Sequence, residues 1–96
     1  MKQAIAQANI DASQIGYVNA HGTATNKGDT VETASIKSVF GDKLPYVSST
    51  KGATGHMMGA GGITEVITCV KAIETGVIPP TINLNEVDPE LSLIHI

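Results

Sequence analysis

The chain lacks arginine and tryptophan, and its 96 residues include one cysteine and only three aromatic side chains. Without arginine, and with a net charge of −3, it lacks the concentrated basic surface that nucleic-acid binding requires. No run reaches the roughly 18 apolar residues of a membrane span, and no basic-then-apolar start indicates a signal peptide. The single cysteine, Cys69, cannot form an internal disulfide, which fits a reducing compartment. We therefore expect neither a nucleic-acid nor a membrane partner.

The shortage of aromatic residues also limits the core. Hydrophobic residues make up 42% of the chain, which is ordinary for a soluble protein, and the length fits a single domain. Ordering each residue costs about 1–2 kcal/mol of backbone entropy, and a small domain buries less surface to offset that cost. We therefore expect some apolar faces to pack against sequence outside these 96 residues.

Hydrophobic spacing predicts short strands and helices along the chain. Gly41 and Gly76 mark two helix ends, and Asp29 with Glu32 three residues later resembles a capping box. The predicted helices cover residues 2–9, 29–41 and 59–75, and the predicted strands cover a buried run at 15–20 and a second run at 46–49.

Five of the ten glycines lie between residues 51 and 62. Glycine permits positive φ and a close approach between backbones. A linker would carry serine, proline and charge, whereas this segment carries His56 and two methionines among its glycines. The composition therefore favours a packed loop over a linker.

The last predicted helix carries one carboxylate on an otherwise apolar stripe. Glu65 shares this stripe with Cys69 and Ala72, four and seven residues further on. Burying a carboxylate costs free energy unless it is paired, so we expect Glu65 to have a partner. Cys69 lies within a helix without a motif around it, which favours core packing over reactivity.

Two histidines, His21 and His56, lie in turns rich in glycine and threonine, and Lys51 precedes the second by five residues. Imidazole donates a hydrogen bond or exchanges a proton near neutral pH. A single histidine in such a turn would more often form a hydrogen bond with a local backbone group. Two histidines in such turns favour a catalytic or ligand-binding site. No HExxH or CxxC spacing is present, and Glu65 adds only a weak signal, so no catalytic metal is predicted.

Three segments resemble the β-ketoacyl-acyl-carrier-protein synthases, most of all the elongating synthase II type. The segment at 19–29 (NAHGTATNKGD) resembles the first histidine motif of that family, and the segment at 48–62 (SSTKGATGHMMGAGG) the second. The segment at 76–84 (GVIPPTINL) resembles the one that follows. Their order and spacing match over residues 15 to about 90.

The resemblance implies part of the C-terminal half of a thiolase-like layered α/β/α/β/α fold. It also implies decarboxylative Claisen condensation of an acyl thioester with malonyl-acyl-carrier protein in fatty-acid elongation. The family's nucleophilic cysteine belongs to the amino-terminal half, so the 96 residues alone would be inactive. The parent would be a cytoplasmic homodimer, bacterial or plastid, that binds acyl carrier protein. It would need no cofactor of its own, since phosphopantetheine is carried by that partner.

The resemblance also implies roles for single residues. His21 and His56 would donate hydrogen bonds to the enolate oxygen formed on decarboxylation, a type of contact worth roughly 3–4 kcal/mol each. Lys51 would hold the surroundings of the second histidine, with Glu65 as its carboxylate partner. The remaining positions are Thr23 and Thr25, which would bind the pantetheine arm or else serve turn hydrogen bonding, and Asn19, which would line a structural cation or water site.

Two alternatives stay open: a ketosynthase domain of a polyketide synthase, and a non-catalytic partner resembling a chain-length factor. The intact histidines and Lys51 argue against the second. Residues 1–90 are interpreted as the partial ketoacyl synthase domain. Residues 91–96 (LSLIHI) match the translated end of a sequencing transposon adapter, so we interpret them as a non-native tail and exclude His95 from the chemistry.

Overall fold

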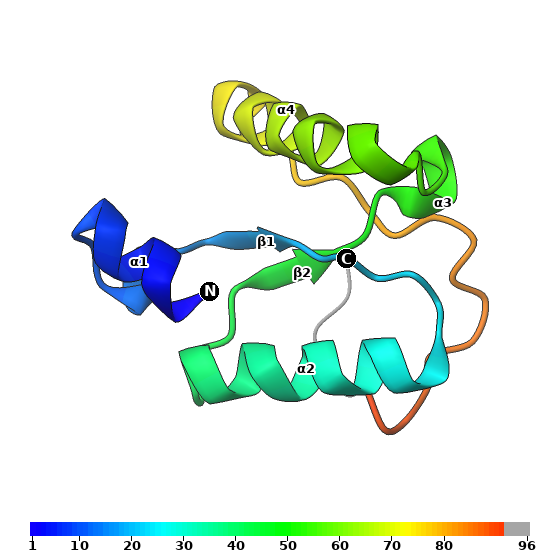
Figure 1. Ribbon diagram of the computed structural model, residues 1–96, viewed down its shortest axis with the longest axis horizontal. Coiled ribbons are helices and arrows are strands. Elements are labelled where there is room, and N and C mark those ends of the chain that lie inside the picture. The colour runs from blue at the N-terminus through cyan, green and yellow to red at the C-terminus, as the bar shows by residue number, and fades with distance from the viewer. Residues whose placement is uncertain (92–96) are drawn as a thin grey trace.

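In the computed structural model, which describes residues 1–91, a small parallel sheet lies between two long helices (Figure 1). Helix α2 covers one face of the sheet and helix α4 the other, while the short α1 lies beside the end of the sheet at which the strands begin. The elements in chain order are α1 (Lys2–Ala8), a 3₁₀ turn (Ala12–Gln14), β1 (Tyr17–Asn19), α2 (Asn26–Phe40), β2 (Tyr46–Ser48), α3 (Lys51–Thr54), a 3₁₀ turn (Met58–Ala60) and α4 (Gly61–Thr75). The predicted α/β class and all five predicted elements are present.

The two strands pair in parallel, with Asn19 opposite Ser48 at their carboxyl ends. A parallel pair needs a crossover connection, and α2 supplies it. One further hydrogen bond, from the Ala20 N–H to the Ser48 carbonyl at 2.8 Å, extends the pairing beyond β1. Both strands are shorter than predicted, and β1 is half-buried rather than buried. The pairing nevertheless fixes the point at which the chain leaves each strand.

The core is small and lies between α2 and the sheet. Ile36, Val47 and Ala20 are buried, and Val18, Phe40 and Leu44 pack around them. As predicted, α2 ends at Gly41, which has a positive φ of 61°.

The predicted capping box at the start of α2 is wrong. The helix begins three residues earlier, at Asn26, with Thr25 in the N-cap position and no side-chain cap. Asp29 therefore lies inside the first turns of the helix. The Glu32 side chain does not cap the helix, because it binds backbone groups of another turn.

The glycine-rich segment is folded and is not a linker. It forms α3, a 3₁₀ turn and the start of α4, which begins two residues later than predicted and ends before Gly76 as predicted. A Cβ on Gly52 would lie 2.9 Å from the Ile82 carbonyl oxygen, and a Cβ on Gly61 would lie 2.7 Å from the His56 carbonyl oxygen. These two glycines therefore provide the predicted close approaches.

The chain after α4 returns along β2. The Ser48 hydroxyl donates to the Pro79 carbonyl at 2.6 Å, and the Ser49 N–H donates to the Thr81 hydroxyl at 3.1 Å. Between this segment, β2 and α2 lies a cavity of about 350 Å³, lined by both apolar and polar residues. Within residues 1–91, no helix has the length and apolarity to cross a membrane. The proposed tail at 91–96 lies outside the described residues, apart from Leu91.

Two adjacent glycines give a matched test of the close approach at the start of α4. We predict that Gly61→Ala destabilises the protein by about 1–3 kcal/mol, because the added methyl meets the rigid His56 backbone. Gly62→Ala is the control, since no atom outside its helix lies within 4 Å of a Cβ there. Urea unfolding of both variants measures the difference. Equal stabilities would contradict the packing described.

Tyr17 gives a test by titration. Burial raises the pKa of its hydroxyl above the usual 10.0, and the 2.8 Å hydrogen bond with the Ser48 hydroxyl offsets part of that rise. A raised folded-state pKa means that Tyr17 stabilises the fold below pH 10, and that this contribution is lost as pH rises through its folded pKa. Absorbance titration in a Tyr46→Phe background isolates Tyr17. Ionisation at or below pH 10.0 would contradict its burial.

Candidate active site

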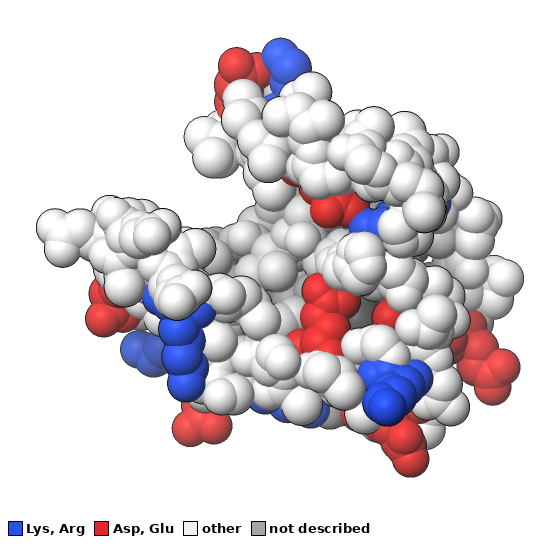
Figure 2. Space-filling view, in the orientation of Figure 1, with Lys and Arg blue, Asp and Glu red and all other residues white. Residues whose placement is uncertain are grey.

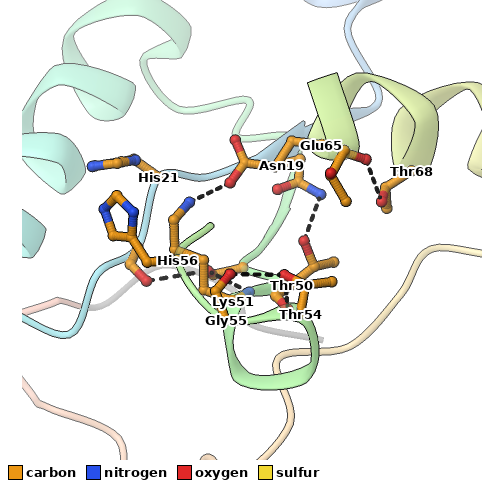
Figure 3. Close-up of polar contacts among 12 residues, drawn as sticks. Asn19, His21, Thr50, Lys51, Thr54, Gly55, His56, Glu65 and Thr68 are labelled. Carbon is orange, nitrogen blue, oxygen red and sulfur yellow. Dashed lines mark hydrogen bonds and ion pairs between the residues drawn. The ribbon is translucent and has the colours of Figure 1, made fainter. Parts of the chain in front are cut away.

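The turns that follow the two strands bring His21 and His56 together (Figure 3). Their ring centroids lie 5.5 Å apart, and the ring planes meet at 84°, edge to face. His21 follows β1 directly, whereas His56 follows β2 and α3. Both residues are exposed, so their rings can meet a ligand. The structure thus pairs two histidines that are 35 positions apart in the sequence.

His56 is oriented by its own turn. Its Nδ1 atom accepts a hydrogen bond from the Met58 N–H at 3.3 Å. A neutral imidazole with an accepting Nδ1 carries its proton on Nε2, so Nε2 is left as a donor. Met57 and Met58 have φ values of 51° and 44°, a strained conformation for residues with side chains. The backbone of this turn is therefore strained, and its conformation leaves the Nε2–H group of His56 available as a donor.

His21 is held through its backbone by Glu32 of α2. The two carboxylate oxygens accept hydrogen bonds from the N–H groups of His21 and Gly22, at 2.8 and 2.9 Å. The sequence pattern did not reveal this role of Glu32, because Asp29 and Glu32 together resemble a capping box. The signal that could have found it is the one that identified Glu65: Glu32 shares a helix stripe with the core residues Ile36 and Phe40, at intervals of four.

Lys51 and Glu65 form an ion pair that joins α3 to α4. Their side chains are 10% and 21% exposed, so both charges are largely removed from water. The prediction that Glu65 needs a partner is confirmed. Figure 3 shows the pair beside the two histidines. Cys69 lies half-buried one turn further along α4, as expected for a packing residue.

Asn19 lies at the end of β1, and its amide group donates a long hydrogen bond of 3.5 Å to the Thr50 hydroxyl. Its Oδ1 atom is buried and has no hydrogen-bond partner. A buried acceptor without a partner costs free energy unless an ion or a water satisfies it. Among residues 1–91, no group of three His, Cys, Asp or Glu side chains could hold a metal ion.

Thr23 and Thr25 lie in the His21 turn, and their hydroxyls are 3.2 Å apart, within hydrogen-bond distance of each other. Ala24 between them has a φ of 59°, so the turn is strained here as well. Neither hydroxyl caps α2. The two side chains therefore form a polar pair within the turn that carries His21.

Glu32 offers a test of the His21 turn. We predict that Glu32→Gln weakens the turn by about 1–3 kcal/mol, because an amide NH₂ then faces a backbone N–H that the carboxylate had satisfied. Amide hydrogen exchange at His21 and Gly22 should accelerate by about tenfold or more. Glu74→Gln, which changes only an exposed pair with Lys71, is the control. Unchanged exchange at both amides would show that Glu32 does not hold the turn.

Comparisons with known proteins identify the family of the chain. Residues 1–85 match the family model described as the β-ketoacyl synthase, C-terminal domain. Nodulation protein E of Rhizobium leguminosarum bv. trifolii is 47% identical over 95 residues, which cover 97% of this chain and 24% of that protein. The 3-oxoacyl-[acyl-carrier-protein] synthase 2 of Vibrio harveyi is 47% identical over 96 residues, which cover 97% of this chain and 23% of that protein.

A solved structure agrees as well. The ishigamide ketosynthase/chain length factor superposes with a TM-score of 0.92 at 41% identity, over 96% of this chain and 23% of that one. The chain thus spans about a quarter of the length of the proteins that it matches. Because the family model covers residues 1–85 of 96, and because relatives at 47% identity align over nearly the whole chain, the chain belongs to the family of β-ketoacyl synthase C-terminal domains.

Proposed function

We propose that the chain is part of a fatty-acid elongating β-ketoacyl-acyl-carrier-protein synthase, and that it supplies the two histidines of the active site. The observation that carries the proposal is the edge-to-face pair of His21 and His56 at 5.5 Å, with the Nε2 atom of His56 left as a donor. The missing partners would be a cysteine nucleophile from elsewhere in a longer chain and an acyl carrier protein. Within a parent of the relatives' length, the described layers would form part of a thiolase-like fold.

The reaction requires donors at a developing negative charge. The bond between the malonyl α-carbon and its carboxylate breaks and CO₂ leaves. The electron pair moves into an enolate whose charge lies on the thioester oxygen. The α-carbon then attacks the acyl thioester on cysteine, and the thiolate departs. In this proposal, N–H groups of His21 and His56 hold the enolate oxygen, as preorganised donors do in other acyl-transfer enzymes.

The surrounding polar groups would support that pair. The Lys51–Glu65 ion pair fixes α3 against α4 and places a cation near the His56 turn. The Thr23 and Thr25 hydroxyls do not cap α2, and in this proposal they would bind the pantetheine arm carried by acyl carrier protein. The buried Oδ1 of Asn19 would contact a structural cation or a water. No resident cofactor is needed, and the parent would act as a cytosolic homodimer.

A second candidate is a ketosynthase of polyketide synthesis. It is favoured by the superposition on the ishigamide ketosynthase/chain length factor at a TM-score of 0.92. Both candidates use the same pair of histidines, so the geometry described supports the condensation step in each. An assay separates the two candidates: the first would condense fully saturated acyl chains, and the second would also condense chains that keep a β-keto group or a double bond.

The proposal predicts that His56→Ala separates two steps in the full-length enzyme. Condensation should fall by about 10²–10³-fold, since one enolate donor is lost. Transfer of the acyl group from acyl carrier protein to cysteine should change little, because no enolate forms in that step. Radiolabelled acyl transfer and product formation measure the two steps separately. Lys71→Ala, on an exposed part of α4, is the control. Equal losses in both steps would show a purely structural role for His56.

A further inference from the structure

Gly28 is a glycine that the backbone of α2 does not require. It is the third residue of a 15-residue helix, a place where glycine is less favourable than alanine. Its φ is not positive, so its backbone conformation is open to any residue. Gly28 is also exposed and lies outside the packed core. The reason for a glycine at this position therefore lies in what a side chain would touch.

A side chain at Gly28 would collide with the threonine pair. A Cβ there would lie 2.3 Å from the Thr25 hydroxyl oxygen and 3.6 Å from the Thr23 hydroxyl oxygen. The second distance is ordinary van der Waals contact, but the first is too short for any real pair of atoms. The Thr25 hydroxyl can move away, because it ends a side chain that rotates about a single bond. A methyl group at position 28 would therefore displace this hydroxyl.

The Thr25 hydroxyl is not used by the helix beside it. Thr25 is the N-cap residue of α2, and an N-cap threonine commonly accepts a hydrogen bond from the N–H group two or three residues further on. Within the described part of the chain, its side chain makes no such bond. The hydroxyl lies instead 3.2 Å from that of Thr23.

A pair of hydroxyls at this distance has the hydrogen-bonding groups that an amide needs. When one hydroxyl donates to the other, the second keeps its own O–H group and the first keeps acceptor lone pairs. The pair thus offers a donor and an acceptor side by side. Thr25 is exposed, as are the first residues of α2, and Figure 2 shows a basic side chain exposed at this end of the helix. A ligand from solvent can therefore reach the pair.

We propose that Gly28 is a positioning residue of the substrate site. By leaving the space of a side chain empty, it keeps the Thr23 and Thr25 hydroxyls together, so that the pair binds an amide group of the pantetheine arm. The inference rests on the proposed function, in which these two threonines bind that arm. Gly28 itself contacts neither the arm nor the reacting atoms. The helix thus contains a less favourable residue for the sake of the hydroxyl pair next to it.

The variant Gly28→Ala in the full-length enzyme tests this inference. The KM for malonyl-acyl-carrier protein should rise by about three- to tenfold, as expected for the loss of one neutral hydrogen bond. The value of kcat should change by less than about twofold, because the lost contact serves binding and both histidines stay in place. Stability toward urea should not fall, since alanine favours the helix.

Gly62→Ala is the matched control. It makes the same substitution near the start of the other 15-residue helix, where no atom of residues 1–91 outside that helix lies within 4 Å of the added Cβ. The KM of this variant should equal that of the unmodified enzyme.

A double-mutant cycle separates an action through Thr25 from a general effect on the fold. Once Thr25→Ala has removed the hydroxyl, adding Gly28→Ala should change KM by less than about twofold. A crystal structure of the Gly28→Ala enzyme reads the cause directly. In it, the Thr25 hydroxyl should have rotated beyond hydrogen-bond distance of the Thr23 hydroxyl.

An unchanged KM in Gly28→Ala would overturn the inference, and so would an equal rise in KM with and without the Thr25 hydroxyl. A loss of stability would also overturn it, because the empty space would then serve the fold. An unmodified enzyme without condensing activity would refute the proposed function instead. In that case the crystal structure and the urea unfolding of Gly28→Ala still decide whether this glycine places the threonine pair.

Discussion

The site depends on the parallel pairing of β1 with β2. Their register places Asn19 opposite Ser48, and the chain leaves both strands at the same edge of the sheet. One exit leads into the turn with His21, and the other leads through α3 into the turn with His56. Three residues in each strand are enough, because α2 and α4 cover both faces and the Ala20 N–H extends the pairing by one more bond. Without this register, the two imidazole rings would not lie next to each other.

Two partly buried carboxylates hold the turns that follow the paired strands. Glu32 of α2 accepts both N–H groups at the start of the His21 turn, and Glu65 of α4 holds Lys51 beside the His56 turn. Each helix therefore fixes one histidine turn through a residue that is costly to bury without a partner. The strained backbone at Ala24, Met57 and Met58 lies in the same two turns, as is common where a scaffold orders an active site.

Local signals predicted the elements well, and tertiary contacts explain the misses. Helix ends at Gly41 and Gly76 follow from residues that tolerate positive φ, and Glu65 was correctly expected to have a partner. The capping box failed because Asp29 and Glu32 fit a local pattern while Glu32 binds a distant turn. No spacing rule could pair two histidines 35 positions apart; only the family resemblance placed them in one site. Periodicity also could not predict which stripe of α4 is covered. In the structure the apolar stripe with Ile63 and Val70 is exposed, and the stripe with Glu65 is half-buried.

The central claim is that both imidazoles serve one oxygen of the substrate. A crystal structure of the full-length enzyme with a non-hydrolysable malonyl-thioester analogue tests it most directly. The account predicts that the thioester oxygen lies within about 3 Å of a ring nitrogen of His21 and of Nε2 of His56. Rings that contact different atoms of the analogue, or that point into separate cavities, would contradict it.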